Sequence, residues 1–286
     1  MRLGYELYKN LNHEIFLPAA AYEIFQTAIL AHDDIIDKSQ LRRGKATLYA
    51  SLGGDHYAIS QSICLGDTGF FLAIQILSNT HFEAENKVQA ISAFTNAMVE
   101  TALGEMLDVE IPSKKIQLSE NTIMQIYKYK TARYSLVGPL QMGAHLAGAS
   151  KSDLEKLKQF GDALGIAYQI QDDILGVFGT EEELGKPITC DVEEGKATIL
   201  LAYAEQIASP SQKKDLKKLY GKGRISAKDF EKIRQIFLQT NSLDQAQAKA
   251  VQYVAEAKKM IPKITKNIEH QQLLYQLADL LIERKK

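Results

Sequence analysis

Three aspartates that follow an apolar segment are the residues best placed to do chemistry. Asp33, Asp34 and Asp37 lie in the stretch AHDDIID, with the spacing DDxxD. Side chains four residues apart share one face of a helix, so Asp33 and Asp37 point the same way. Two carboxylates aimed at one point repel each other unless a cation lies between them, and Mg²⁺ takes one or two such carboxylates together with waters and substrate phosphates. We therefore expect Asp33 and Asp37 to be metal ligands and Asp34 to support them.

Two arginines follow these acids along the chain. Arg42 and Arg43 precede Gly44 in the stretch QLRRGKATLY. A guanidinium group can capture two phosphate oxygens at once, so acids that need a metal beside bases that need an anion predict a metal–diphosphate site. The alternative is a solvated helix end of mixed charge. The strongly apolar segment 19–31 argues against that alternative, because an exposed helix end does not need such a burial pattern.

A second pair of acids follows another apolar segment. Asp172 and Asp173 lie in the stretch GIAYQIQDDILGVFG. Two acid pairs that each close a helix fit two helices that face each other across one cavity. This hypothesis requires both pairs to approach the same bound group.

A series of motifs gives the chain its resemblance to a known family. HDDIID, RRGKATLY, KTARYS, YQIQDD, GKP and EGKAT resemble, in this order, the motifs of trans-type isoprenyl diphosphate synthases, the polyprenyl synthetase family, of the geranylgeranyl or longer-chain type. Each motif alone is weak, but their order and spacing from about Ala19 to Thr198 are specific. The resemblance implies head-to-tail prenyl transfer, in which an allylic diphosphate ionises, the double bond of isopentenyl diphosphate attacks the cation, and a proton is lost. It also implies a single domain over residues 1–286 with the isoprenoid synthase fold.

The resemblance further implies roles for individual residues. Arg42 would bind the allylic diphosphate and Arg43 isopentenyl diphosphate, which Gln26 would also contact. The residues that would contact or fold over the allylic diphosphate are Lys130, Thr131, Gln169, Lys186 and Lys196. In the second acid pair Asp172 would be the better metal ligand and Asp173 the next, and the metal would be Mg²⁺ at about three ions per active site. The alternative for Gln26 is a satisfied polar group in the core, and a lone lysine on a helix is usually solvated.

Several positions depart from the family pattern. Gly176 stands where the second DDxxD motif has an acid, and we expect Gln169, Asp173 and water to complete that side of the site. Ala46 and Tyr49 replace a Pro and a His of the family. The chain begins after the place of the Gly-Lys-Arg segment with which the family binds isopentenyl diphosphate, so the domain lacks the usual first helix. We therefore expect either a shortened chain or a weak site for that substrate.

Small residues ahead of the first acids bear on product length. The allylic tail should run from Asp33 beside the preceding helix, with Ala28 and Ile29 at the floor of its pocket. Ala28 is too small to stop the tail, which makes Phe25 and then Tyr22 the next candidates. This steric argument predicts a product of about twenty carbons or more. The alternatives are that these residues only pack the core, or that another helix stops a shorter product.

The composition favours helices throughout. The chain has 286 residues, of which 45% are hydrophobic, with no Trp and only 6 Pro. Because good helix formers dominate, we predict an all-α, single-domain bundle of about ten or more helices around a central cavity. Helices are expected at residues 18–31, 57–77, 84–107, 119–136, 140–149, 152–173 and 196–207 and again within 226–286, with turns or loops at 112–115, 180–194 and 209–223. The segment 57–77 is apolar all round, which predicts a buried, central helix.

Charge and cysteine content narrow the setting. A formal net charge of -1, with acids and bases interspersed, gives no field that would attract nucleic acid or an anionic membrane. Cys64 and Cys190 cannot build a disulfide framework, which favours a reducing cytosol and a cytoplasmic protein. The N-terminus lacks a signal peptide, and no stretch approaches the ~20 apolar residues of a membrane span, so no transmembrane segment is expected. The resemblance implies a homodimer, with the apolar helices after Gly54 at its interface.

Two other functions compete with a prenyl diphosphate synthase. A non-catalytic or weakly active regulatory subunit would fit the missing Gly-Lys-Arg segment and Gly176, but such a subunit need not keep the acids and bases of the site. A class I terpene cyclase also uses DDxxD and Mg²⁺, although the arginine pair and the second acid pair disfavour it. An assay of the purified chain separates them, because a cyclase consumes one prenyl diphosphate without isopentenyl diphosphate.

Overall fold

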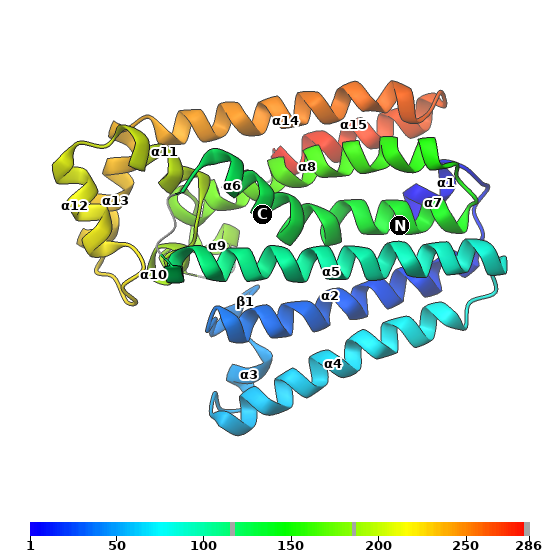
Figure 1. Cartoon of the computed structure of the whole chain (residues 1–286), viewed down its shortest axis with the longest axis horizontal. Coiled ribbons are helices and arrows are strands. Elements are labelled where there is room, and N and C mark those ends of the chain that lie inside the picture. Colours follow the sequence, from blue (N-terminus) through cyan, green and yellow to red (C-terminus); the bar gives the residue numbers. More distant parts are fainter. Residues whose placement is uncertain (115–117, 185–186, 283–286) are drawn as a thin grey trace. The chain divides into compact units, whose positions relative to one another are not determined.

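The computed structural model describes residues 1–114, 118–184 and 187–282, and helices make up nearly all of its regular structure (Figure 1). In chain order the elements are α1 (Arg2–Glu6), the 3₁₀ turn η1 (His13–Ile15), α2 (Phe16–Ile36), β1 (Leu41–Arg42), β2 (Lys45–Ala46), α3 (Leu48–Ser51), α4 (His56–Ser78), α5 (Ala84–Lys114), α6 (Glu120–Ile126), the π-helix η2 (Tyr127–Val137), α7 (Gly138–Leu146), α8 (Lys151–Phe178), α9 (Glu181–Leu184), α10 (Cys190–Glu194), α11 (Ile199–Ile207), α12 (Pro210–Leu219), α13 (Ala227–Gln239), α14 (Ser242–Ile264) and α15 (Ile268–Ile282). The prediction of an all-α fold with many helices is confirmed.

The described chain forms two compact units. Unit 1 holds residues 1–98 and 136–158, and unit 2 holds residues 99–135 and the described part of 159–286. The predicted site residues of α2 and the segment after it belong to unit 1, whereas those of η2, α8 and the segment before α11 belong to unit 2. A single domain over the whole chain and a cavity shared by both acid pairs stay predictions.

Small residues bring α2 and α4 close together in unit 1. A Cβ atom at Gly69 of α4 would lie 2.8 Å from the Cβ of Ala28, and one at Gly66 would lie 2.3 Å from Nε2 of His32. The same ring nitrogen lies 3.1 Å from the carbonyl oxygen of Ile63. A side chain at Gly69 would push the helices apart, and one at Gly66 would displace the His32 ring. These glycines therefore let α4 pack closely against the turn of α2 that leads into the first acids.

A cluster of aromatic rings anchors α2 further back. The ring of Phe25 lies edge-on to that of Phe94 on α5, with 5.0 Å between the centroids, and 5.7 Å from that of Phe70 on α4. Tyr22 contacts both Phe25 and Phe94 in the same edge-to-face manner, which aromatic pairs prefer. Phe25 and Phe94 are fully buried. The end of α2 is therefore held by rigid packing rather than by its own helix propensity.

The core of unit 2 surrounds α8 and α11. Its fully buried side chains include Ile123 of α6, Ile170 and Val177 of α8, Ile199 and Leu200 of α11, and Ile233 and Phe237 of α13. These apolar faces hold α8 from several neighbouring helices, as is usual for a contiguous core. The polar residues that α8 carries are consequently fixed in direction.

The predicted helix 119–136 is wrong in its second half, because the backbone widens into the π-helix η2 from Tyr127 to Val137. Two glycines of neighbouring helices touch it: a Cβ at Gly104 of α5 would lie 2.2 Å from the backbone nitrogen of Lys130, and one at Gly165 of α8 would lie 2.4 Å from the Cβ of Ala132. π-helices are rare and occur frequently at functional sites. This one carries the motif KTARYS.

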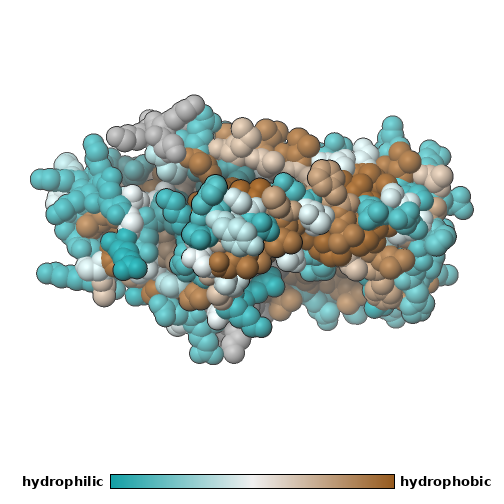
Figure 2. Space-filling view, turned by 90° about the horizontal axis from the view of Figure 1, so that it is seen from below, coloured by the Kyte–Doolittle hydropathy of each residue, from teal (hydrophilic) through white to brown (hydrophobic). Residues whose placement is uncertain are grey.

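The prediction that the segment 57–77 is buried and central is wrong for this chain. The corresponding helix α4 exposes large apolar side chains, with Phe71 73% and Tyr57 63% accessible and Leu65 about half accessible. Figure 2 shows a face of the molecule on which apolar residues are spread among polar ones. Periodicity counts the apolar residues of a helix but does not tell whether the same chain covers them.

Several predicted loops are helical. The turn expected at 112–115 does not end α5 before Pro112, which lies in the last turn of the helix and so removes only one terminal hydrogen bond. The loop expected at 180–194 contains the short helices α9 and α10, and the connection expected at 209–223 contains α12. Ser209 and Gln212 form a capping box at the start of α12, a signal that the polar composition of the segment obscured. The helix expected from 196 begins at Ile199.

Two helices are long and apolar enough to cross a membrane when only length and composition are considered. They are α2 with the turn before it (His13–Ile36) and α4 (His56–Ser78). The statement that no stretch approaches this length is therefore wrong for these two helices. Tyr22 and Phe25 on α2 are buried within unit 1. Core helices of folded proteins bury apolar side chains in the same way. That neither helix crosses a membrane stays a prediction.

Candidate active site

The first acids lie at the C-terminal end of α2. The helix ends because Lys38 adopts a left-handed conformation, with φ of 55°. The backbone N–H of Ser39 then donates to the carbonyl oxygen of Asp34, 2.9 Å away. The backbone N–H of Lys38 donates to the carbonyl oxygen of Ile35, 3.3 Å away. This is the hydrogen-bond pattern that commonly closes helices, here with Lys in the place of Gly. Asp33 and Asp37 are partly exposed beside it, and Asp34 is buried.

A two-stranded hairpin places Arg42 against these acids. Its Nη2 donates to Asp33 Oδ2 and its Nε to Asp34 Oδ1, both at 2.7 Å. In the hairpin Arg42 pairs with Lys45. The two turn residues, Arg43 and Gly44, have φ of 52° and 73°, as a type I′ turn requires. The turn leaves Arg43 exposed and directs Arg42 inward, so the two arginines have different surroundings.

The segment after the hairpin holds it in place. Tyr49, which replaces a His of the family pattern, is buried, and its hydroxyl accepts a hydrogen bond from Gln40 Nε2 at 2.7 Å. The Oγ1 of Thr47 donates to the carbonyl oxygen of Ser39 at 2.8 Å. Both contacts tie the strands to the end of α2. The substitution at position 49 thus keeps a polar contact at this point.

Burial and charge set the protonation of this group. Burial raises the pKa of the Asp34 carboxyl, while the guanidinium of Arg42 acts in the opposite direction. Burial lowers the pKa of Arg42, but the carboxylates of Asp33 and Asp34 raise it by more, so the net shift is upward. Arg42 therefore stays charged and balances the acids. Partly exposed carboxylates such as Asp33 and Asp37 offer the hard oxygen ligands that Mg²⁺ takes.

The residues predicted to limit product length follow α2 backwards from the acids. Phe25 belongs to the buried aromatic cluster, Ala28 is buried against Gly69 of α4, and Ile29 is partly exposed. Gln26, which was predicted to contact isopentenyl diphosphate, is also partly exposed. The Ala28 side chain thus abuts the neighbouring helix. A larger residue there would have to displace α4, whereas one at position 29 has more room.

The two acids of the second pair differ sharply in their surroundings within α8. Asp172 is partly exposed. Asp173 is only 5% exposed, and each of its carboxylate oxygens accepts a hydrogen bond, Oδ1 from Gln169 Nε2 at 3.0 Å and Oδ2 from the hydroxyl of Tyr127. Gln169 in turn accepts from Thr131 Oγ1 at 2.7 Å. The predicted site residues Thr131, Gln169 and Asp173 are therefore brought together.

Burial dominates the titration of this group. It raises the pKa of Asp173 to about 7, while the hydrogen bond from Tyr127 acts to lower it and the nearby carboxylate of Asp191 acts to raise it. Burial likewise raises the pKa of Tyr127 well above its ordinary value, and the charge of Asp173 adds to this effect. The tyrosine hydroxyl therefore keeps its proton and remains a donor.

The position of the missing acid is filled from another element. A Cβ atom at Gly176 would lie 2.4 Å from Oδ2 of Asp191, which follows the GKP motif and lies on α10. Asp191 is only 6% exposed, and its Oδ1 lies 3.8 Å from Nζ of Lys196. Sequence reasoning missed Asp191. Its place between the motifs GKP and EGKAT was the available signal, but its approach to α8 depends on tertiary structure.

The predicted lysines lie beside carboxylates. Nζ of Lys130 contacts Asp108 Oδ2 at 2.6 Å and Glu105 Oε2 at 2.8 Å. Nζ of Lys196 lies 3.4 Å from Glu194 Oε2. Lys186 lies outside the described residues. The two described lysines, Lys130 and Lys196, thus lie beside acids, and each must exchange those acids for a phosphate when it binds one.

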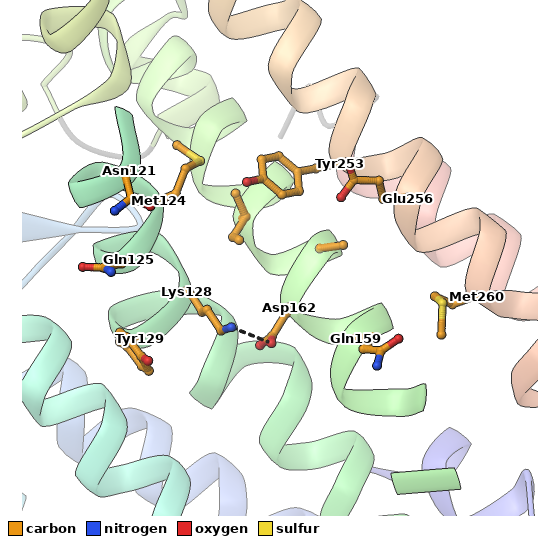
Figure 3. Close-up of a pocket in the computed structure, with 12 residues that line it drawn as sticks. Asn121, Met124, Gln125, Lys128, Tyr129, Gln159, Asp162, Tyr253, Glu256 and Met260 are labelled. Carbon is orange, nitrogen blue, oxygen red and sulfur yellow. Dashed lines mark ion pairs between the residues drawn. The ribbon is translucent and has the colours of Figure 1, made fainter. Parts of the chain in front are cut away.

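A pocket of about 590 Å³ opens elsewhere in unit 2, between α6, η2, α8 and α14 (Figure 3). Its residues include Met124, Tyr253 and Met260, together with an ion pair in which Lys128 Nζ lies 3.3 Å from Asp162 Oδ2. None of the described residues that line it is a predicted site residue. The pocket is therefore distinct from the group around Asp173.

Comparison with known proteins places these motifs in context. The family model for polyprenyl synthetases matches residues 3–237. A geranylgeranyl diphosphate synthase of Sulfolobus acidocaldarius is 30% identical over 290 residues, covering 100% of this chain and 85% of the relative. A geranylfarnesyl diphosphate synthase of Aeropyrum pernix is 30% identical over 94% of this chain and 82% of the relative.

Solved structures agree with the sequence relatives. The chain superposes with a TM-score of 0.93 on a geranylgeranyl pyrophosphate synthase from Corynebacterium glutamicum in complex with isoprenyl diphosphate and magnesium, at 29% identity, covering 99% of this chain and 84% of that one. A polyprenyl synthase from Caulobacter crescentus, in complex with calcium and isoprenyl diphosphate, gives a TM-score of 0.87 at 30% identity, covering 99% and 83% of the two chains.

Proposed function

We propose that this chain, which belongs to the polyprenyl synthetase family, condenses an allylic diphosphate with isopentenyl diphosphate to a trans-prenyl diphosphate of about twenty carbons or more. The family match over most of the chain carries this proposal, together with relatives that are geranylgeranyl and geranylfarnesyl diphosphate synthases. The arginine held against Asp33 and the hydrogen-bonded group around Asp173 support it. Neither the regulatory-subunit nor the terpene-cyclase alternative gains support from these observations.

Magnesium fits the acids of both groups. Asp33, Asp37 and Asp172 would hold it, because they are partly exposed carboxylates with the oxygen ligands that this ion prefers. When bound, it would offset the negative charge that develops on the leaving diphosphate, at about three ions per active site.

The charged side chains would act by exchanging partners. Arg42 bridges Asp33 and Asp34. Its guanidinium would have to leave Asp33 to grip the diphosphate, and Asp33 would then hold magnesium in its place. Lys130 and Lys196 would make the same exchange from their carboxylates, and Lys186 would join them. Electrostatic stabilisation of a departing charge is usually the largest single contribution to catalysis. Thr131 and Gln169 would line the reacting centre, and Arg43 and Gln26 would contact isopentenyl diphosphate.

A second copy of the chain would cover the exposed apolar face of α4. Phe71, Leu65 and Tyr57 lie on that face, and monomeric proteins rarely leave large apolar patches uncovered. We therefore propose a homodimer. The two free cysteines support a reducing, cytoplasmic setting for it. Phe71→Glu should shift the sedimentation coefficient from that of a dimer to that of a monomer, and an unchanged coefficient would argue against this interface.

The test of the function is product analysis. The purified chain is incubated with isopentenyl diphosphate, magnesium and allylic starters of increasing length, and the hydrolysed products are separated by chromatography. We expect chain elongation that stops completely without magnesium. Asp33→Asn should abolish it, whereas Asp244→Asn on the exposed start of α14 serves as the matched control. Absence of elongated product with every starter would refute the proposal.

A further inference from the structure

We propose that Tyr127 is a positioning residue that sets the direction of Asp172, the metal ligand of the second acid pair, and the start of α11 behind Lys196. This proposal rests on the proposed function, because it concerns how the same site is held. Nothing in the motifs assigns a role to position 127, which lies ahead of the KT pair. The hydrogen bonds of its hydroxyl carry the argument.

The hydroxyl of Tyr127 joins segments that are far apart in the sequence. It donates to Oδ2 of Asp173 on α8 and accepts from the backbone N–H of Ile199, the first residue of α11, at 2.8 Å. A tyrosine hydroxyl has one proton to donate, and here the carboxylate receives it. The side chain is 3% exposed, so water does not substitute for these partners.

These contacts complete a closed set of hydrogen bonds between η2 and α8. Thr131, four residues after Tyr127, donates to Gln169, and Gln169, four residues before Asp173, donates to the other oxygen of that carboxylate. Each helix thus contributes two side chains that are four residues apart. The π-helical backbone of η2 puts Tyr127 and Thr131 in register with their partners on α8.

This arrangement fixes Asp173 as a buried anchor. Burying a carboxylate is costly unless hydrogen bonds replace its water, and Tyr127 and Gln169 supply one to each oxygen. Because neighbouring residues of a helix point in different directions, an anchored Asp173 turns Asp172 away from the core. In this account Asp173 acts through Asp172 and does not itself bind metal.

The same hydroxyl also fixes the segment that carries Lys196. The first N–H groups of a helix lack partners within the helix, and Tyr127 satisfies that of Ile199. Tyr220 holds the other side of this segment, because its hydroxyl donates to the carbonyl oxygen of Lys196 at 3.0 Å. One side chain of η2 therefore links Asp173, the neighbour of the acid that would hold metal, with Ile199, which lies three residues after Lys196.

The experiment removes only the hydroxyl, with Tyr127→Phe. Calorimetry measures the binding of inorganic pyrophosphate at increasing Mg²⁺, and steady-state kinetics give kcat and the KM of each substrate. We expect the Mg²⁺ concentration for half-maximal pyrophosphate binding to rise roughly 10- to 100-fold, as when other groups that orient metal ligands are lost. The value of kcat should fall, while the KM for isopentenyl diphosphate changes little.

Two further variants separate positioning from a general loss of stability and from direct ligation. Tyr203→Phe, the matched control, removes the hydroxyl that donates to Glu120 at 3.1 Å in the same unit and should leave the Mg²⁺ dependence unchanged. Asp173→Asn can rebuild the closed set, because an amide both accepts from Tyr127 and donates to a rotated Gln169. It should therefore weaken Mg²⁺-dependent binding less than Tyr127→Phe does.

Specific results would overturn the proposal. Equal Mg²⁺ dependence in Tyr127→Phe and the wild-type chain would refute it, as would a larger defect in Asp173→Asn than in Tyr127→Phe. The proposed function fails separately, when the wild-type chain binds pyrophosphate with Mg²⁺ but makes no elongated product. Pyrophosphate binding therefore tests the positioning role whatever the outcome of the product assay.

Discussion

The acids at the end of α2 and those near the end of α8 have the same DD sequence but opposite surroundings. Asp33 and Asp34 are balanced by a charged partner, the guanidinium of Arg42. Asp173 is instead held by neutral donors in the core, and only its neighbour Asp172 is partly exposed. The same DD motif can therefore have different roles at two places in one chain, because the hydrogen-bond partners and the burial of each acid determine its role.

The kind of partner determines whether an acid can change partners. A carboxylate that is paired with a cation can exchange it for another cation, as Asp33 would when Mg²⁺ displaces Arg42. The buried carboxylate of Asp173 is held by neutral Tyr and Gln donors. Breaking these hydrogen bonds leaves buried polar groups unsatisfied. The first acid pair is therefore suited to binding, and Asp173 to holding the structure in place.

The largest expected effect contrasts one acid from each region. Asp33→Asn should lower kcat/KM by at least about 100-fold, because it removes a metal ligand and the charge that metal binding needs. Asp173→Asn should lower it much less, because the hydrogen bonds of Asp173 can be rebuilt by the amide. Steady-state kinetics with saturating Mg²⁺ measure both. An equal loss of kcat/KM in both variants would mean that the two acids have the same role in catalysis.

Gly176→Asp tests how the second region tolerates the family's usual acid. A side chain there meets Oδ2 of Asp191, 2.4 Å from the position of its Cβ, and adds a like charge. We expect a loss of about 1–3 kcal/mol in the free energy of unfolding, the usual cost of overpacking, measured by urea denaturation. Combining it with Asp191→Gly should recover most of that loss. A stable single variant would show that Asp191 does not occupy this space.

Arg42→Ala tests whether Mg²⁺ and the Arg42 guanidinium compete for Asp33 at the end of α2. Removing the guanidinium takes away one competitor for Asp33, so Mg²⁺ should bind several-fold more tightly in the absence of diphosphate. Pyrophosphate should bind more weakly at saturating Mg²⁺, because a charge-assisted contact is lost. Calorimetry measures both affinities, with Arg43→Ala in the exposed turn as the comparison. Weaker Mg²⁺ binding in Arg42→Ala would contradict the exchange.

The smallest expected effect concerns product length. Ile29→Phe should shorten the product with little change in thermal stability, because this side chain is partly exposed. Ala28→Phe should lower the melting temperature as well, because position 28 abuts Gly69 of α4. Chromatography of the hydrolysed products and a melting curve distinguish the two variants. An unchanged product in both would place the floor of the pocket on another helix.

The sequence predicted the helices that carry the site residues better than the contacts that orient those residues. The apolar runs before Asp33 and Asp172 identified α2 and α8, because burial of one face leaves a periodic pattern. The π-helix around Lys130 escaped notice, since pattern reading assumes the ordinary helical period. Asp191 was missed because its approach to Gly176 comes from separate elements. The exposure of α4 was missed because composition does not show which surfaces the chain itself covers.

One measurement tests most directly whether Asp33, Asp37 and Asp172 bind metal while Asp173 holds the structure in place. Crystals grown with Mn²⁺ in place of Mg²⁺ and with an unreactive thiolo analogue of an allylic diphosphate would locate the metal by anomalous scattering. We expect metal peaks on Asp33 and Asp37 and on Asp172, each also touching the diphosphate, with Asp173 still hydrogen-bonded to Tyr127. A metal ion on Asp173, or acids that meet no common diphosphate, would contradict the account.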